Sequence, residues 1–125
     1  MNTMRKSNKT NIIYDLEDRT TRFGESIINY VKSINQDVVT RPLIDQLVRS
    51  GTSIGANYCE ADDAESKKDF RHKIGICKKE SRECRYFLRM MRKSVTGKEI
   101  EIRELIKEAT ELNLIFNTIY RKVSE

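Results

Sequence analysis

The chain has 125 residues, which is the size of one domain. One proline, five glycines and no tryptophan are too few turn formers for a β-sandwich or β-barrel. A net charge of +5 favours an anionic partner, and the absence of long apolar runs predicts a cytoplasmic protein without a membrane helix or secretory signal.

Residues 1–11 are polar and basic, and we expect them to form a flexible arm that precedes a single domain over residues 12–125. Apolar residues at helical spacing predict a first helix from about Tyr14 to Ile34. A second helix is predicted from Pro42 to Ala61, since proline suits a first helical turn, with Thr40 as its N-cap.

Two glycines lie one turn apart in the second predicted helix, Gly51 and Gly55. Glycine in a helix interior costs up to about 1 kcal/mol relative to alanine, so it needs a compensating contact. We interpret the pair as a place where another helix approaches closely. The alternative is a phosphate-binding turn over residues 51–55, although the Gly-Lys-Ser/Thr of a P-loop and a preceding strand are both missing.

Ser66 with Asp69 resembles a capping box and predicts the start of a third helix over residues 67–93. Seven residues of this segment are spaced alternately by four and three, which is heptad spacing. They are Phe70, Ile74, Cys77, Ser81, Cys84, Leu88 and Met91. After a turn, a fourth helix is predicted over residues 98–123. Four helices with short links predict an all-α, up-down-up-down four-helix bundle.

Positive charge is concentrated in the third helix, because residues 66–95 hold 11 basic and 3 acidic residues. Six of the basic residues follow the apolar lane, each displaced by one position, over about 31 Å of helix. We call these six the basic stripe: Arg71, Lys78, Arg82, Arg85, Arg89 and Arg92. Five are arginines, the side chain that makes forked contacts with phosphate.

Three interpretations of the basic stripe remain open. Its side chains cover the edge of the core and pair with carboxylates of the second or fourth helix. Alternatively they bind the phosphates of a nucleic acid, or they contact an acidic protein partner or a neighbouring subunit. Base stacking is poorly supported, because Tyr86 is the only interleaved aromatic residue that we expect to be exposed beside the stripe.

The opposite flank of the third helix combines Ile76, Phe87 and Met90 with the carboxylates Glu80 and Glu83. A bundle helix that is apolar on a second side often buries that side against another chain. We therefore predict that Ile76, Phe87 and Met90 lie in the interface of a homo-oligomer. The two carboxylates, together with Glu60, are expected to pair with Arg49 or with a neighbouring subunit.

Catalytic and metal chemistry find little support in the sequence. The single histidine, His72, has no glutamate three residues before it, which excludes the Glu-x-x-His pairs of di-iron bundles. Three cysteines, an odd number, indicate reduced thiols that act as small buried hydrophobic residues. We expect no metal, no cofactor, no small-molecule substrate and no enzymatic activity.

A specific resemblance emerges over residues 14–122. Residues 47–57 (LVRSGTSIGAN) with Glu60 resemble the signature helix of the bacterial 23S rRNA intervening-sequence proteins. Residues 68–70 (KDF), 79–83 (KESRE) and 15–20 (DLEDRT) are similar to other parts of that family. The chain departs from the family pattern at Tyr58-Cys59 and Asp62-Asp63, near the end of the second helix.

This resemblance implies a left-handed four-helix bundle assembled as a ring, typically a homopentamer. Genes of the family often lie in inserts within ribosomal RNA genes, for which reason RNA binding has been suggested. A related branch, the accessory variability proteins of diversity-generating retroelements, works with a reverse transcriptase and nucleic acid. The family supplies no catalytic residue.

The sequence thus predicts a non-enzymatic oligomer that binds RNA or other nucleic acid electrostatically through the basic stripe. The alternative is an oligomeric scaffold or accessory protein that binds a protein partner, with the stripe used in subunit or partner contacts.

Overall fold

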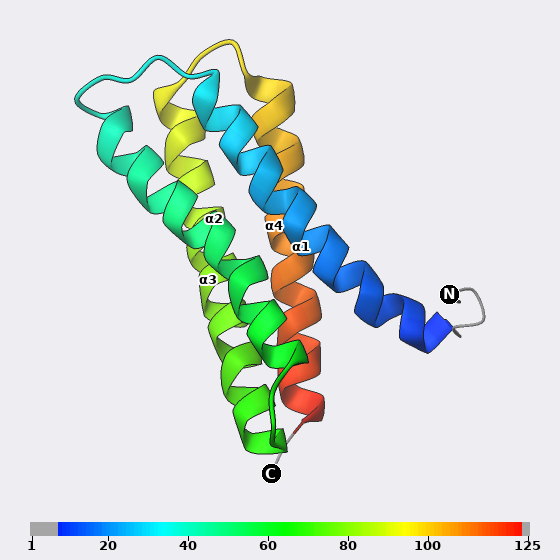
Figure 1. Ribbon diagram of the computed structural model, residues 1–125. Coiled ribbons are helices and arrows are strands. Elements are labelled where there is room, and N and C mark those ends of the chain that lie inside the picture. The colour runs from blue at the N-terminus through cyan, green and yellow to red at the C-terminus, as the bar shows by residue number, and fades with distance from the viewer. Residues whose placement is uncertain (1–7, 124–125) are drawn as a thin grey trace.

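The computed structural model describes residues 8–123, with side chains from Leu16 onward, and the described part is all α-helical. The four helices are α1 (Asn8–Lys32), α2 (Thr40–Asp62), α3 (Lys67–Ser94) and α4 (Glu99–Lys122). Successive helices run in opposite directions, which confirms the predicted up-down-up-down bundle (Figure 1). Contacts join α1 to α2, α2 to α3 and α3 to α4, while α1 meets α4 only sparsely.

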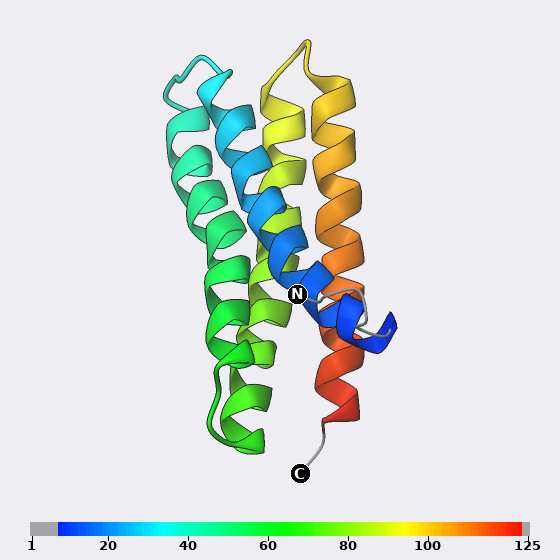
Figure 2. The same cartoon turned by 45° about the vertical axis from the view of Figure 1, so that its right-hand side comes forward.

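Helix α1 begins at Asn8, six residues before the expected start at Tyr14. Residues 8–11, which we expected in a flexible arm, are therefore helical, and residues 1–7 of that arm lie outside the described residues. Figures 1 and 2 show the first turns of α1 projecting away from the other three helices. The flank of α4 that faces α1 is consequently the least covered side of the bundle.

The core follows the predicted apolar lane of α3. Cys77, Ser81, Cys84 and Leu88 are all fully buried, as the heptad spacing predicts. Leu47 and Ile54 of α2 and residues of α1 and α4 are buried in the same cluster. The hydroxyl group of Ser81 donates a hydrogen bond to the Lys78 carbonyl (3.0 Å), so the one polar residue of the lane is satisfied inside the core.

Local hydrogen bonds explain where the helices begin. The Ser66 hydroxyl accepts a hydrogen bond from the Asp69 amide (3.0 Å), so the predicted cap of α3 is confirmed. Thr40, in contrast, is the first residue of α2 rather than its cap. The N-cap position is Val39, and the carboxylate of Asp37 accepts hydrogen bonds from the amides of Val39 and Thr40 at 2.9 and 2.8 Å. These backbone hydrogen bonds, chiefly that from Thr40, lower the pKa of Asp37.

Two glycines of α2, Gly51 and Gly55, lie where α1 and α2 pack closely. A Cβ on Gly51 would lie 3.0 Å from Cγ1 of Ile27, and a Cβ on Gly55 would lie 3.3 Å from Oγ1 of Thr20. Both contacts are tighter than ordinary van der Waals separations, so the missing side chains are what allow this approach. Because residues 51–55 are helical and packed on α1, the alternative of a phosphate-binding turn is wrong.

An ion-pair cluster and two hollows lie between α1 and α4, where the two helices make few contacts. Arg19 of α1 makes a forked contact with Glu108 (2.7 and 2.9 Å) and also reaches Glu111 (2.8 Å). These contacts raise the pKa of Arg19, chiefly through the hydrogen bond to Glu108. The two hollows, of about 560 and 460 Å³, share Ser26, Glu104 and Leu105, and the larger one is also lined by Arg19 and Glu108. Arg19 therefore holds two of the acidic groups on this stretch of α4, Glu108 and Glu111.

Candidate nucleic-acid interface

The basic stripe lies on the flank of α3 that faces α4. Arg82, Arg89 and Arg92 are exposed, whereas Arg71, Lys78 and Arg85 are half-buried. Neighbours on the flank come from α4, as shown by hydrogen bonds that join Arg71 to Tyr120 and Asn113 to the Lys78 carbonyl. The stripe therefore follows a boundary between two helices rather than the outermost ridge of the bundle.

Both ends of the stripe are used within the chain. The Arg71 guanidinium lies 3.8 Å from the ring centroid of Tyr120 and donates to the Tyr120 hydroxyl group (3.1 Å). Lys78 Nζ lies over the same ring, 4.6 Å from its centroid. At the other end, Arg92 pairs with Glu99 of α4 at 2.7 Å. Arg92 thus pairs with a carboxylate of α4 as the first interpretation predicts, whereas Arg71 and Lys78 pack on an aromatic ring of α4.

The middle of the stripe is different. Across the described side chains, residues 16–123, no ion pair involves Arg82, Arg85 or Arg89. The α4 carboxylates of Glu108 and Glu111 pair with Arg19 of α1 instead. Three adjacent guanidinium groups thus keep their positive charge uncompensated by direct pairing.

A groove of about 390 Å³ lies between α3 and α4, and Arg82 is the one of these three arginines that lines it. We call it the α3–α4 groove, and it is lined by Gly75, Lys78, Lys79, Arg82, Asn113, Asn117 and Tyr120. Its lining holds three cations and no carboxylate, so its electrostatic potential favours an anion. The volume lies within the range of about 300–1,000 Å³ that is usual for small-ligand sites.

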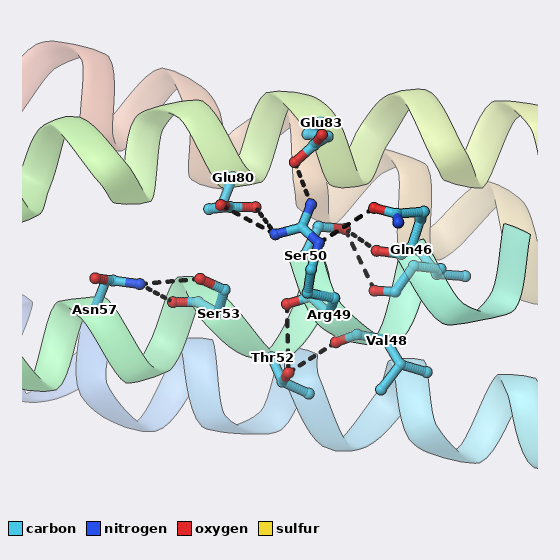
Figure 3. Close-up of polar contacts among 10 residues, drawn as sticks. Gln46, Val48, Arg49, Ser50, Thr52, Ser53, Asn57, Glu80 and Glu83 are labelled. Atoms are coloured by element: carbon cyan, nitrogen blue, oxygen red, sulfur yellow. Dashed lines mark hydrogen bonds and ion pairs between the residues drawn. The ribbon is translucent and has the colours of Figure 1, made fainter. Parts of the chain in front are cut away.

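Carboxylates gather on the opposite flank of α3, where they meet α2. Arg49 donates to both oxygens of Glu80 (3.1 and 3.2 Å) and also contacts Glu83 (Figure 3). The hydrogen bond from Arg49 is the main cause that lowers the pKa of Glu83. Glu60 pairs with Lys73 at 2.6 Å. Arg49 pairing is thus confirmed for two of the three carboxylates, and this acidic flank is separate from the basic one.

The predicted interface residues Ile76, Phe87 and Met90 are each half-buried within one chain. Phe87 packs against the core and makes an edge-to-face contact with Tyr86, at 5.3 Å between ring centroids. Of the three, Phe87 is therefore used inside the bundle. More strongly exposed apolar side chains lie on α4, where Ile100 is 71% and Leu114 59% exposed.

Cysteine and metal chemistry add no further site. Cys77 and Cys84 are buried, and burial raises the pKa of each thiol to about 12. Cys59 is exposed, so the expectation of buried thiols is wrong for that residue. Within residues 16–123 no group of three or more potential ligands is arranged to hold a metal ion. No helix of the described segment is long and apolar enough to cross a membrane.

Sequence reasoning missed the α4 side of the groove, formed by Asn113, Asn117 and Tyr120. Their spacing of four and three residues is helical, so it marks one face of α4 and was available as a signal. Gly75 was missed as well. A Cβ there would lie 3.0 Å from Cε1 of Tyr120, so this glycine allows the ring to pack on α3.

Comparisons with known proteins agree with the fold and the motifs. The family model described as 23S rRNA-intervening sequence protein matches residues 14–118. A solved structure, a protein of unknown function from the S23 ribosomal protein family of Bacteroides thetaiotaomicron VPI-5482, is 30% identical with a TM-score of 0.72. That match covers 83% of this chain and 96% of the other. A comparison with curated proteins gave no match. With most of its length matched by the family model, the chain belongs to the 23S rRNA-intervening sequence protein family.

Proposed function

We propose that this protein is a non-enzymatic homo-oligomer that binds RNA, or another nucleic acid, through the basic stripe. The observation that carries the proposal is the uncompensated charge of Arg82, Arg85 and Arg89, of which Arg82 lines a groove that also holds two lysines and no carboxylate. A cation that is already paired within the chain must give up that ion pair to bind phosphate, which lowers its net contribution to the binding free energy. These three arginines lose no intramolecular ion pair on binding.

Assembly strengthens this kind of binding. The family resemblance suggests five chains, and a ring would present several copies of the stripe to one nucleic acid. Contacts that are weak singly then add, because later contacts form within an existing complex. Exposed apolar groups such as Ile100 and Leu114 offer surface for subunit contacts. Light scattering should return a multiple of the 14.7 kDa chain mass, and a single-chain mass at micromolar concentration contradicts the oligomer.

The direct test replaces Arg82, Arg85 and Arg89 together by glutamine. Each neutralised phosphate contributes about −0.7 to −0.9 to the slope of log K against log salt. The triple variant should weaken binding to all sequences alike and flatten the slope by about 2–3, because phosphate contacts carry no base information. A matched control replaces Arg22, Lys32 and Arg41, which are exposed on α1 and α2 away from the stripe, by glutamine. It removes equal charge and should bind nearly as the wild type does.

Two results would overturn the proposal. Absence of binding to duplex, single-stranded or ribosomal RNA at about 50 mM salt excludes an electrostatic nucleic-acid protein. Disassembly of the stripe variant, with the control variant still assembled, identifies the stripe as a subunit contact. The oligomeric scaffold for a protein partner then becomes the better description.

A further inference from the structure

The α3–α4 groove differs from the rest of the stripe because hydrogen bonds orient one of its polar groups. Asn113 Nδ2 donates to the Lys78 carbonyl (2.9 Å) and to the Ser81 hydroxyl oxygen (3.1 Å). An amide nitrogen has two hydrogens, so both donors of this side chain are taken by α3. What Asn113 can offer a ligand is its carbonyl oxygen, which is an acceptor only.

That oxygen is open to a ligand. Asn113 lines the groove and is half-buried, and its Oδ1 is not among the buried, unpartnered polar atoms of the described side chains. An acceptor fixed among three cations does not suit a bare phosphate, whose oxygens are themselves acceptors at neutral pH. The arrangement suits a ligand that carries negative charge and, close to it, a hydroxyl or amino donor.

Tyr120 narrows the choice of ligand. Arg71 and Lys78 both lie over its ring, and the α3 backbone at Gly75 packs against its edge. A ring engaged in this way is not free to stack on a base, so the groove is not built for the faces of bases. Within the sugar-phosphate backbone the donor close to a phosphate is the ribose 2′-hydroxyl, which RNA has and DNA lacks, whereas the amino donors belong to the bases and lie farther from the phosphates.

We infer that the α3–α4 groove distinguishes RNA from DNA: Lys78, Lys79 and Arg82 attract phosphate while the Asn113 carbonyl accepts a hydrogen bond from a ribose 2′-hydroxyl. This inference rests on the proposed function and names its ligand more narrowly. It requires no base contact, so the preference for RNA is independent of base sequence.

The test compares one hairpin sequence made as RNA, as 2′-fluoro RNA and as DNA, each titrated onto the full-length wild-type protein. The 2′-fluoro chain keeps the A-form shape of RNA and lacks the 2′ donor, so it separates shape from hydrogen bonding. One hydrogen bond of ordinary net strength predicts RNA binding about 2- to 10-fold tighter than 2′-fluoro RNA. Equal affinity for RNA and 2′-fluoro RNA overturns the inference, whatever the result with DNA.

Two variants test whether Asn113 causes the preference for RNA over 2′-fluoro RNA. Asn113→Ala should bring the RNA to 2′-fluoro RNA affinity ratio close to one. Asn57→Ala is the matched control, since the Asn57 amide likewise donates to a carbonyl and a hydroxyl group of Ser53, both at 2.9 Å, on α2 (Figure 3). It should leave the ratio unchanged, and a fall in that variant instead contradicts a role specific to the groove.

The two proposals fail in different ways. If all three hairpins bind with the expected salt dependence and equal affinity, the proposed function holds and the groove does not read the 2′-hydroxyl. If none binds at low salt, both proposals fall. Should Asn113→Ala fail to fold, the comparison of the three hairpins on the wild-type protein still decides.

Discussion

The close approach of α1 and α2 can be tested by giving Gly51 and Gly24 the same substitution, alanine. Both glycines lie inside helices, so alanine should gain up to about 1 kcal/mol of helix propensity at either position. The surroundings differ. At Gly51 the new Cβ would lie 3.0 and 3.3 Å from Cγ1 and Cγ2 of Ile27, whereas at Gly24 its nearest neighbour is 3.7 Å away.

The tight contact at Gly51 cannot be relieved cheaply, because Ile27 is fully buried and has no open space to move into. Overpacking of a filled core costs about 1–3 kcal/mol, which exceeds or cancels the gain in propensity. Gly51→Ala should therefore lower the free energy of unfolding by about 0–2 kcal/mol. Gly24→Ala should raise it by about 0.5–1 kcal/mol, since ordinary van der Waals contact imposes no such cost.

Urea titrations followed by far-ultraviolet circular dichroism, at one fixed protein concentration, would measure both values. The expected difference between the variants is about 0.5–3 kcal/mol, or roughly 2–12 °C in Tm for a domain of this size. A Gly51→Ala variant that is as stable as Gly24→Ala refutes the reasoning. It would mean that α1 and α2 separate easily, and that Gly51 is not held at a close contact.

Two further predictions concern the acidic flank and the thiols. Replacing Glu83 by glutamine should destabilise the protein slightly at neutral pH, and the difference from wild type should vanish in acid. The pKa of Glu83 is lowered in the folded protein. Its carboxylate therefore stabilises the fold fully above the pKa of the unfolded state, and this stabilisation is lost as the pH falls through the pKa of the folded state. Urea titrations across that pH range would show this, and a difference that persists in acid would mean that Arg49 does not favour the ionised carboxylate. Titration of the native protein with Ellman's reagent at pH 8 should modify Cys59 quickly and leave Cys77 and Cys84 unreacted until urea unfolds the bundle; three fast thiols in the native state contradict the buried core.

The pattern of residues predicted the secondary structure and the core of α3 because both depend on local spacing. Apolar residues at intervals of four and three must share one face of a helix, so Cys77 and Leu88 point inward in any bundle of this kind. The cap at Ser66 is equally local, since its hydrogen bond spans three residues. The start of α2 was harder to predict from the sequence, because two polar residues, Asp37 and Thr40, can both accept hydrogen bonds from backbone amides there.

The sequence by itself determined that α3 has one basic and one acidic flank, because neighbouring lanes on a helix follow from spacing alone. Only the tertiary structure decided which charges find partners. Arg19 holds Glu108 from a position 89 residues away in the chain, and Asn113 reaches the Lys78 carbonyl across 35 residues. Such pairs depend on how neighbouring helices rotate and slide against each other, which is fixed by packing over the whole core, including the contact made possible at Gly51. The uncompensated arginines at the centre of the stripe are therefore a property of the fold, although every one of them is visible in the sequence.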